Sequence, residues 1–246
     1  MTLQEQFENS GQWLFRWRSY LPLAGIAMVL LALPEYEYPG HSETLDHIWE
    51  VICLCVSFFG LAIRIYTIGH TPKNTSGRNT KRQVADALNT TGVYSVVRNP
   101  LYLGNFFMFL GVALFPHLWW LTLIFVLAFW LYYERIIFAE EAYLRTKFGA
   151  EFLDWADRTP VFVPRFRNYQ KPNLPFSLKN VLRREYNGFF AVILCLFLLE
   201  TIGDLYIHRR FEPDAEWIVA LCVGFVIWAI LRTLKRRTGL LDVPGR

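Results

Sequence analysis

The sequence predicts an all-α integral membrane protein with five or six transmembrane helices. Hydrophobic residues make up 54% of the 246-residue chain and aromatic residues 17%, which exceeds what an ordinary soluble domain needs to fill one core. Because a helix needs about 20 residues to cross the hydrocarbon core, the shorter apolar runs must borrow flanking residues or pair as a hairpin. The candidate spans are Tyr20–Leu33, Ile48–Ile63, Leu101–Phe115, Leu118–Tyr133, Gly188–Leu199 with a polar continuation to Ile207, and Trp217–Leu231.

Charged residues outside these runs predict the orientation of the chain. The first run lacks a cleavage site of the Ala-x-Ala type, so we expect it to remain as an anchor helix. The loop that follows it has acidic residues and no Lys or Arg up to the second run, which places this loop outside the cytoplasm. We expect both termini, the loop 69–98 and the segment 134–186 in the cytoplasm, with Arg209 and Arg210 as the one discordant pair. The basic residues that support this are Arg16, Arg18, Lys73, Arg78, Lys81, Arg82, Arg98, Arg232, Lys235, Arg236 and Arg237.

The cysteines and histidines do not form a metal or redox pattern. The four cysteines lie inside apolar runs, where a free thiol packs as a small hydrophobe. The five histidines are scattered over loops and span ends, and no two are spaced to share a helix face. We therefore expect structural thiols, no metal and no nucleic-acid partner.

A dense motif precedes the third apolar run: Gly92-x-Tyr94-x-x-x-Arg98-Asn99-Pro100-x-Tyr102-x-Gly104. Pro100 has no amide hydrogen and disfavours helix at Asn99, so the sequence predicts a helix that begins at Pro100. The free backbone amides of such a start favour a carboxylate or phosphate ligand. A structural interpretation stays open, because a proline at a helix start and an interfacial tyrosine are common in membrane proteins.

The loop before this motif is polar and rich in turn-forming residues up to Arg82. The residues that follow Arg82, 84–88, are predicted to form a short helix or an interfacial segment. The alternative is a solvated connector that basic residues hold near anionic lipid.

A second motif, Glu140-Glu141-x-x-Leu144-x-x-x-Phe148-Gly149, follows the fourth apolar run. The third and fourth runs are predicted to form a helical hairpin that turns at Pro116-His117 and returns this motif to the membrane face of the first. Beyond it we expect an amphipathic helix and an extended lid over 159–164. Acidic residues here favour a ligand that carries a cation or hydroxyls, although a charged interfacial rim has the same pattern.

These motifs resemble a known superfamily. Arg-Asn-Pro-x-Tyr-x-Gly at 98–104 is similar to the Arg-His-Pro-x-Tyr-x-Gly signature of the isoprenylcysteine carboxyl methyltransferases and phospholipid methyltransferases. The second motif, with Val163-Pro164, resembles the later part of that family's cofactor domain. The resemblance covers about 50–167 and implies a membrane-embedded enzyme that binds S-adenosylmethionine in a pocket at the cytoplasmic face. It divides the chain into an N-terminal anchor and outer loop (1–49), a methyltransferase-like core (50–167) and a C-terminal amphipathic segment with an extra hairpin (168–246).

The resemblance also implies site residues. Asn99 replaces the family's usual His; Asn can donate a hydrogen bond but cannot become cationic, which favours holding the cofactor over proton transfer. Arg98 and Arg135 are the catalytic candidates, as groups that orient the acceptor, and Arg98 equally suits a fixed part of its turn. The residues implied to bind the cofactor are Asp86, Ala87, Leu88, Asn89, Tyr94, Asn99, Pro100, Leu101, Tyr102, Glu140 and Glu141.

The expected acceptor is a lipid-soluble molecule from the bilayer, with membrane lipid as the surroundings. Methyl transfer from a sulfonium needs a positioned acceptor and a water-poor site but little acid–base help. Without a histidine near the motifs, an anionic or thiolate acceptor is favoured over an amine. A prenylcysteine carboxylate, a lipid phosphate and a phospholipid headgroup stay open. Two other functions also stay open: an NADPH-dependent reductase of the sterol type, and a non-catalytic membrane scaffold or transporter.

Overall fold

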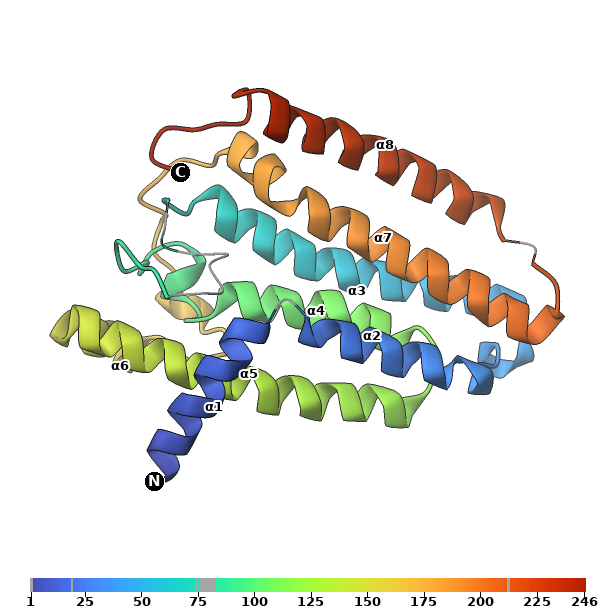
Figure 1. The fold of residues 1–246 in the computed structure, drawn as a ribbon, viewed down its shortest axis with the longest axis horizontal. Coiled ribbons are helices and arrows are strands. Elements are labelled where there is room, and N and C mark those ends of the chain that lie inside the picture. Colours follow the sequence, from blue (N-terminus) through green and yellow to red (C-terminus); the bar gives the residue numbers. More distant parts are fainter. Residues whose placement is uncertain (1, 19, 74, 76–82, 212) are drawn as a thin grey trace.

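The computed structural model is all-helical in the part that it describes, which comprises residues 2–18, 20–73, 75, 83–211 and 213–246. Most of the long helices run side by side, and the longer connecting loops gather at the end beside α6 (Figure 1). No described residue belongs to a strand, so the all-α prediction is confirmed. The α-helices are α1 Leu3–Trp17, α2 Leu21–Ala32, α3 Glu43–Gly69, α4 Pro100–Leu114, α5 Trp119–Phe148, α6 Ala150–Arg158, α7 Leu178–His208 and α8 Ala215–Arg237.

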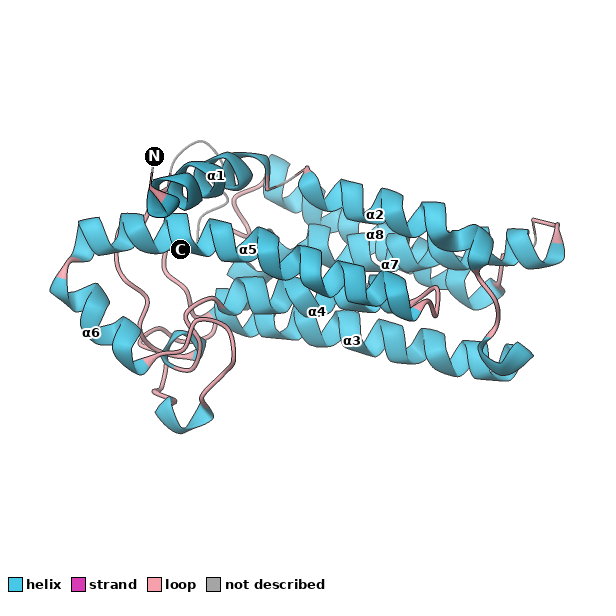
Figure 2. Cartoon of the chain, turned by 90° about the horizontal axis from the view of Figure 1, so that it is seen from below, coloured by secondary structure: helices cyan, strands magenta, loops and turns pink. Residues whose placement is uncertain are grey.

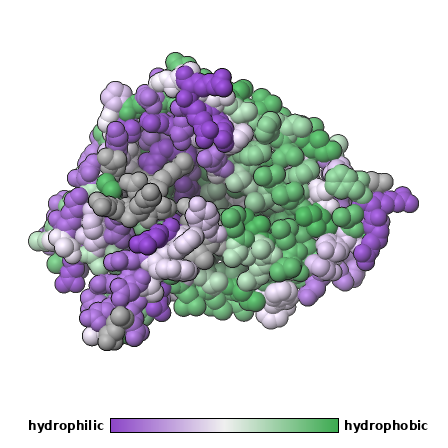
Figure 3. Space-filling view, viewed as in Figure 1, coloured by the Kyte–Doolittle hydropathy of each residue, from purple (hydrophilic) through white to green (hydrophobic). Residues whose placement is uncertain are grey.

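Four of these helices, α3, α5, α7 and α8, are long and apolar enough to cross a membrane. Two shorter apolar helices accompany them, Leu23–Glu35 around α2 and Pro100–Leu114 in α4. The 15 residues of α4 extend only about 22 Å, less than a hydrocarbon core of about 30 Å. Apolar surface covers the middle of the molecule and hydrophilic surface covers its ends (Figure 3). The chain is an integral membrane protein with four long apolar helices and two shorter ones, where the sequence predicted five or six spans.

Glycines bring α3 and α4 into backbone contact. A Cβ atom at Gly60 of α3 would lie 2.5 Å from the amide nitrogen of Met108 on α4, and closer still to the Gly104 carbonyl oxygen. Farther along the pair, Gly111 lies against Ser57, whose hydroxyl donates to the Met108 carbonyl oxygen at 3.1 Å. In lipid, where apolar surface alone gives little drive for helix association, this close packing is a main source of stability.

The hairpin predicted between the third and fourth apolar runs is present. α4 begins at Pro100, as predicted, and the chain turns at Pro116-His117, where His117 has a left-handed φ of 56°. α5 then continues beyond Tyr133 as far as Phe148, because no glycine or proline interrupts it before Gly149, whose φ is 55°. The second motif therefore lies on the extension of a membrane helix, and the amphipathic helix predicted after it is α6.

α7 is one continuous helix of 31 residues, whereas the sequence predicted an amphipathic segment followed by a separate span. Gly188 alone does not interrupt it, and there the helix lies close to Met108 of α4 and Leu61 of α3. α7 packs along α3 and also contacts α4. α7 thus belongs to the core of the bundle, whereas α8 is mostly exposed at its edge.

The segment before the first motif is only partly described. Residues 83–90 form no helix there, so the short helix considered for 84–88 is absent. The basic residues Arg78, Lys81 and Arg82, which contributed to the predicted orientation, lie outside the described residues.

The contact between α3 and α4 gives a test of the packing. We expect Gly60→Ala to lower the free energy of unfolding by about 1–3 kcal/mol, because the added methyl group meets backbone atoms. Gly25→Ala is the matched control, since a Cβ at Gly25 of α2 meets nothing within 4 Å. Thermal unfolding in detergent, followed by circular dichroism, measures both variants. Equal stability of the two would contradict the backbone contact.

Candidate functional site

A cavity of about 530 Å³ lies at the end of the bundle where α4 begins. Its wall combines residues of α3, α4, α5 and α7 with the end of α1 and the segment 83–99. Figure 2 shows α1, α6 and several loops gathered at this end of the molecule. The volume is within the range of about 300–1,000 Å³ that small-molecule sites usually have.

Most of the predicted site residues line this cavity. The two motifs meet there although Tyr102 and Glu140 are 38 positions apart. Asp86, Glu141 and Arg135 are not among the lining residues. Those that line it are Ala87, Leu88, Asn89, Tyr94, Arg98, Asn99, Pro100, Leu101, Tyr102 and Glu140.

Glu140 is the member of the acidic pair that faces the cavity. The Tyr102 hydroxyl donates to its Oε1 atom at 2.8 Å, and Nη1 of Arg18 lies 3.4 Å from the same oxygen. Nη1 of Arg18 also lies 3.3 Å from the Tyr102 hydroxyl. Arg18 therefore belongs to the site, although the sequence analysis used it only to predict orientation. The place of Arg18 just before the first apolar run indicates that it lies at the membrane surface, but nothing in the sequence links it to Glu140.

Glu141 faces the other way and pairs with Arg98. Nη1 of Arg98 lies 3.2 Å from Oε2 of Glu141, which ties the first motif to α5. The backbone amide of Arg98 donates to the Pro160 carbonyl oxygen at 2.9 Å, so this turn also contacts the predicted lid. Nε of Arg98 is buried and has no hydrogen-bond partner among the described residues.

The segment 159–164, predicted as an extended lid, is irregular with bends at 159 and 161–163, and it pairs with the first motif. The Asn99 side-chain amide donates to the Val161 carbonyl oxygen at 3.1 Å, and the Trp155 indole donates to the Tyr94 carbonyl oxygen at 3.0 Å. Phe162 packs with aromatic residues of α4 and α5, among them Phe106. These contacts hold the motif and the lid as one unit at the cavity.

A buried polar network extends from the cavity into the bundle. Arg64 of α3 forms a two-pronged ion pair with Glu185 of α7, with Nε–Oε2 and Nη2–Oε1 distances of 2.7 and 2.9 Å. Nη1 of Arg64 donates to Asn105 Oδ1 on α4 at 2.6 Å, and Asn105 Nδ2 donates to the Tyr133 hydroxyl on α5 at 3.0 Å. All four side chains line the cavity. The sequence analysis missed Glu185 and Asn105, whose roles depend on contacts between separate helices.

Asn89 presents an unpaired donor to the cavity. Its Nδ2 atom is buried beside the Tyr94 side chain, but it has no partner at full hydrogen-bond geometry among the described residues. Nearby in the chain, burial raises the pKa of Tyr94 to about 12, so its hydroxyl stays protonated at neutral pH. Because buried polar groups are normally hydrogen-bonded, the Asn89 amide suits a ligand that offers an acceptor.

Arg135 lies outside the cavity and contacts α1. Its guanidinium is 3.5 Å from the centroid of the Phe7 ring, and Gly11 packs against its backbone. Phe7 also meets Phe138 edge to face, with ring centroids 5.7 Å apart. The position of Arg135 therefore suits attachment of α1 to α5.

The fold and the cavity define a class: an integral membrane protein with a cavity of apolar, polar and charged residues at one end of its helix bundle. Residues 49–151 match the family described as phospholipid methyltransferase. This range contains both motifs and the hairpin between them. This match and the isoprenylcysteine methyltransferases among the relatives support the superfamily that the motifs predicted for this part of the chain, the isoprenylcysteine carboxyl methyltransferases and phospholipid methyltransferases.

Individual relatives carry two kinds of name. The chain is 35% identical to the nickel-cobalt-cadmium resistance protein NccN of Alcaligenes xylosoxydans xylosoxydans, over 57% of this chain and 61% of the relative. It is 34% identical to the cobalt-zinc-cadmium resistance protein CzcN of Cupriavidus metallidurans, over 53% of this chain and 58% of the relative. It is also 34% identical to a protein-S-isoprenylcysteine O-methyltransferase of Schizosaccharomyces pombe, over 34% of this chain and 36% of the relative. The chain thus spans about three fifths of the first two relatives. No solved structure matches it at a significant level.

The ion pair at the cavity gives a second test. We expect Glu185→Gln to lower the free energy of unfolding by about 3–5 kcal/mol, because it leaves the Arg64 guanidinium buried without its counter-charge. Glu151→Gln, on the exposed face of α6, is the matched control and should change stability by less than about 0.5 kcal/mol. Thermal unfolding in detergent measures both.

A double variant separates pairing from packing in this test. Replacing Arg64 and Glu185 together with Met should recover much of the loss, because no buried charge then remains. A double variant no more stable than Glu185→Gln would show that the contribution of these residues is not the charge pair.

Proposed function

We propose that this protein transfers a methyl group from S-adenosylmethionine to a lipid-soluble acceptor. The observation that carries the proposal is the cavity, which is built from both motifs of the superfamily although a helical hairpin separates them in sequence. It lies at one end of a membrane bundle, where a ligand from the bilayer and one from water can both arrive. We also propose that this end faces the cytoplasm, as the basic residues around it favour.

The residues at the cavity fit this cofactor. Glu140 provides a carboxylate for its cationic groups, and the unpaired Asn89 amide provides a donor for its acceptor atoms. In the first turn of α4 the amides of Tyr102 and Leu103 already donate to the Asn99 carbonyl oxygen, so the Leu101 amide is the one that suits its carboxylate. When bound, S-adenosylmethionine supplies an electrophilic methyl group on its sulfonium. We assign the other predicted residues that line the cavity to the surrounding wall, and place Asp86 and Glu141 outside it.

In this proposal the side chains around the two glutamates hold the site in place. Tyr102 and Arg18 hold its carboxylate in place, and Arg98 fixes the turn of the first motif through Glu141. Arg98 is therefore a positioning residue in this proposal, and Arg135 attaches α1 instead of orienting the acceptor. Asn99 holds the lid through the Val161 carbonyl, which is a role that needs no ionisation.

The charge of the wall favours an anionic acceptor. The charged side chains that line the cavity are the arginines Arg18, Arg64, Arg98 and Arg184 and the glutamates Glu140 and Glu185. Once Glu141, the partner of Arg98, is counted with them, these side chains leave one net positive charge, which favours a carboxylate, phosphate or thiolate over an ammonium group. No histidine is among the described lining residues to remove a proton from an amine. A prenylcysteine carboxylate or a lipid phosphate thus fits better than an amine headgroup.

The names of two relatives favour a second candidate function. Both are metal-resistance proteins, and they are 34–35% identical to this chain over more than half of its length. We propose that methyl transfer by this protein contributes to resistance to such metals. Survival of a sensitive bacterial host on cadmium or cobalt, with the intact chain and with Glu140→Gln, tests this. Equal survival of both strains and the empty host would contradict it.

Cofactor binding gives the most direct test of the site. We expect Glu140→Gln to weaken the affinity for S-adenosylmethionine at least about tenfold, because hydrogen bonds to charged groups contribute about 1.5–3 kcal/mol. Glu134→Gln is the matched control, since Glu134 is exposed on the same helix and does not line the cavity. Isothermal titration calorimetry on protein in nanodiscs measures both, with S-adenosylhomocysteine as a second ligand. Unchanged affinity in Glu140→Gln would refute the assignment of Glu140.

NADPH is the control ligand for the activity itself. Saturable binding of NADPH without binding of S-adenosylmethionine would replace the proposal with a reductase. Binding of neither, in protein shown to be folded, would favour a scaffold or transporter. Where S-adenosylmethionine binds, transfer of labelled methyl to prenylcysteine and to a lipid phosphate identifies the acceptor.

The lid contact gives a separate test. We expect Asn99→Ala to weaken cofactor affinity about fivefold, because it removes a hydrogen bond worth about 1 kcal/mol between the motif and the lid. Asn99→His should keep the affinity near that of the intact protein, since a neutral imidazole can donate the same bond. The same calorimetry measures both variants. Equal loss in the two would show that position 99 needs an amide for another reason.

A further inference from the structure

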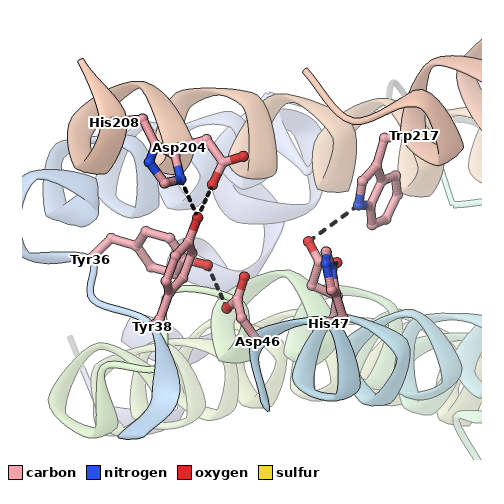
Figure 4. Close-up of polar contacts among 8 residues, drawn as sticks. Tyr36, Tyr38, Asp46, His47, Asp204, His208 and Trp217 are labelled. Carbon is pink, nitrogen blue, oxygen red and sulfur yellow. Dashed lines mark hydrogen bonds and ion pairs between the residues drawn. The ribbon is translucent and has the colours of Figure 1, made fainter. Parts of the chain in front are cut away.

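Five acidic residues gather at the end of the bundle opposite the cavity. Asp46 and Glu50 come from α3, Glu200 and Asp204 from α7, and Asp214 from the residue before α8. Figure 4 shows Asp46 and Asp204 of this group with their neighbouring side chains. One carboxylate oxygen from each of Asp46, Glu50 and Glu200 lies within 4.8 Å of the others, and the same holds for Glu200, Asp204 and Asp214. Glu200 belongs to both groups and so joins them.

The carboxylates are buried, and their described surroundings supply little positive charge. Asp46 is 2% exposed, Glu50 5% and Glu200 2%. The ion pair found for them among the described residues joins Glu50 to His47, at 3.3 Å. Because an uncompensated charge is costly inside a bundle, these groups need protons or a cation.

One oxygen of Glu200 stands out in this cluster. Its Oε2 atom is buried and has no hydrogen-bond partner among the described residues, although Glu50 and Asp204 lie close enough to share a proton with the same side chain. A shared proton joins two carboxyl groups, whereas a cation can contact an oxygen of each of them at once. We therefore take Oε2 as the atom available to a ligand that the chain does not provide.

Neighbouring donors hold the carboxylates in place. The Tyr36 hydroxyl donates to Oδ1 of Asp46 at 2.6 Å, and the Trp217 indole donates to Oε1 of Glu50 at 3.2 Å. The Tyr38 hydroxyl donates to Oδ1 of Asp204 at 2.8 Å. Figure 4 shows these tyrosines and the tryptophan directed at the acidic groups. Hydrogen-bond donors around carboxylate ligands are a common feature of metal sites.

We propose that Asp46, Glu50 and Glu200, with Asp204 and Asp214 beside them, bind a divalent cation of the Ca²⁺ or Mn²⁺ kind. Oxygen atoms on opposite sides of a Ca²⁺ ion lie about 4.6–5.2 Å apart, so three oxygens within 4.8 Å can all reach one ion. An all-oxygen donor set favours these hard cations over the softer ions that sulfur and imidazole select. The proposal is independent of methyl transfer, since no cluster residue lines the cavity.

The sequence analysis expected no metal because it considered the spacing of cysteines and histidines. The cluster instead joins two acidic pairs, one on α3 and one on α7, that are far apart in the sequence and meet only in the folded bundle. The side chain of His47 is 51% exposed, so the cluster lies close to the surface, where an ion can enter from water.

Binding of Mn²⁺ to the full chain in detergent tests the proposal. Electron paramagnetic resonance follows the free ion, whose signal falls as Mn²⁺ binds. We expect saturable binding that Ca²⁺ displaces, and at least about tenfold weaker binding in Glu200→Gln. Glu43→Gln is the matched control, since Glu43 is exposed in the first turn of α3, and its affinity should stay within about twofold of the intact protein.

Each other outcome overturns the proposal. Absence of saturable binding in folded protein would show that the carboxylates are protonated, and equal binding in Glu200→Gln would place the ion elsewhere. Should Glu200→Gln fail to fold, Asp214→Asn replaces it, because Asp214 is only partly buried and makes no cap hydrogen bond to α8. Asp214→Asn should weaken Mn²⁺ binding severalfold, and an unchanged affinity there counts against the site. Loss of S-adenosylmethionine binding alone would concern only the proposed methyl transfer.

Discussion

A buried ion pair between α3 and α7 fixes the arrangement on which the cavity depends. The side chains of Arg64 and Glu185 are 17% and 4% exposed, and either charge alone would be costly inside an apolar bundle. Asn105 and Tyr133 extend the pair to α4 and α5, so one network joins four helices. In lipid, apolar contacts alone discriminate poorly among the ways that helices can pack. The network supplies that discrimination at the place where the cavity wall is formed.

Backbone pairing then gives the cavity its outer wall. Pro100 starts α4 without an amide hydrogen, and the chain just before it pairs with the lid: the Arg98 amide donates to Pro160, and the Arg165 amide donates to Val96. Irregular backbone at the edge of a membrane needs such partners, because lipid offers none. The motif and the lid therefore satisfy each other, which explains why two segments so far apart in the sequence belong to one site.

Local signals account for most of what the sequence predicted correctly. The start of α4 at Pro100, the turn at Pro116-His117 and the hairpin between the motifs each follow from proline, glycine or an apolar run. The contributions of Arg18 and Glu185 depend on contacts with residues 122 and 121 positions away, which no local pattern encodes. α7 was divided wrongly because its first turns are polar, although they pack inside the bundle. The roles of the cavity residues stay predictions, since geometry alone does not assign chemistry.

The two polar regions lie at opposite ends of the same helices. Of the described helices, α3 and α7 carry residues of both: Arg64 and Glu185 at the cavity, Glu50 and Glu200 at the acidic cluster. Fifteen helical residues separate Glu185 from Glu200, about 22 Å, a distance at which two unit charges interact by less than about 1 kcal/mol at an effective dielectric constant of about 20. Direct electrostatic coupling between the ends is therefore weak. A cation at the acidic end would act on the cavity through the packing of α3 against α7, which the Arg64–Glu185 pair already fixes, so its main effect falls on the stability of the bundle.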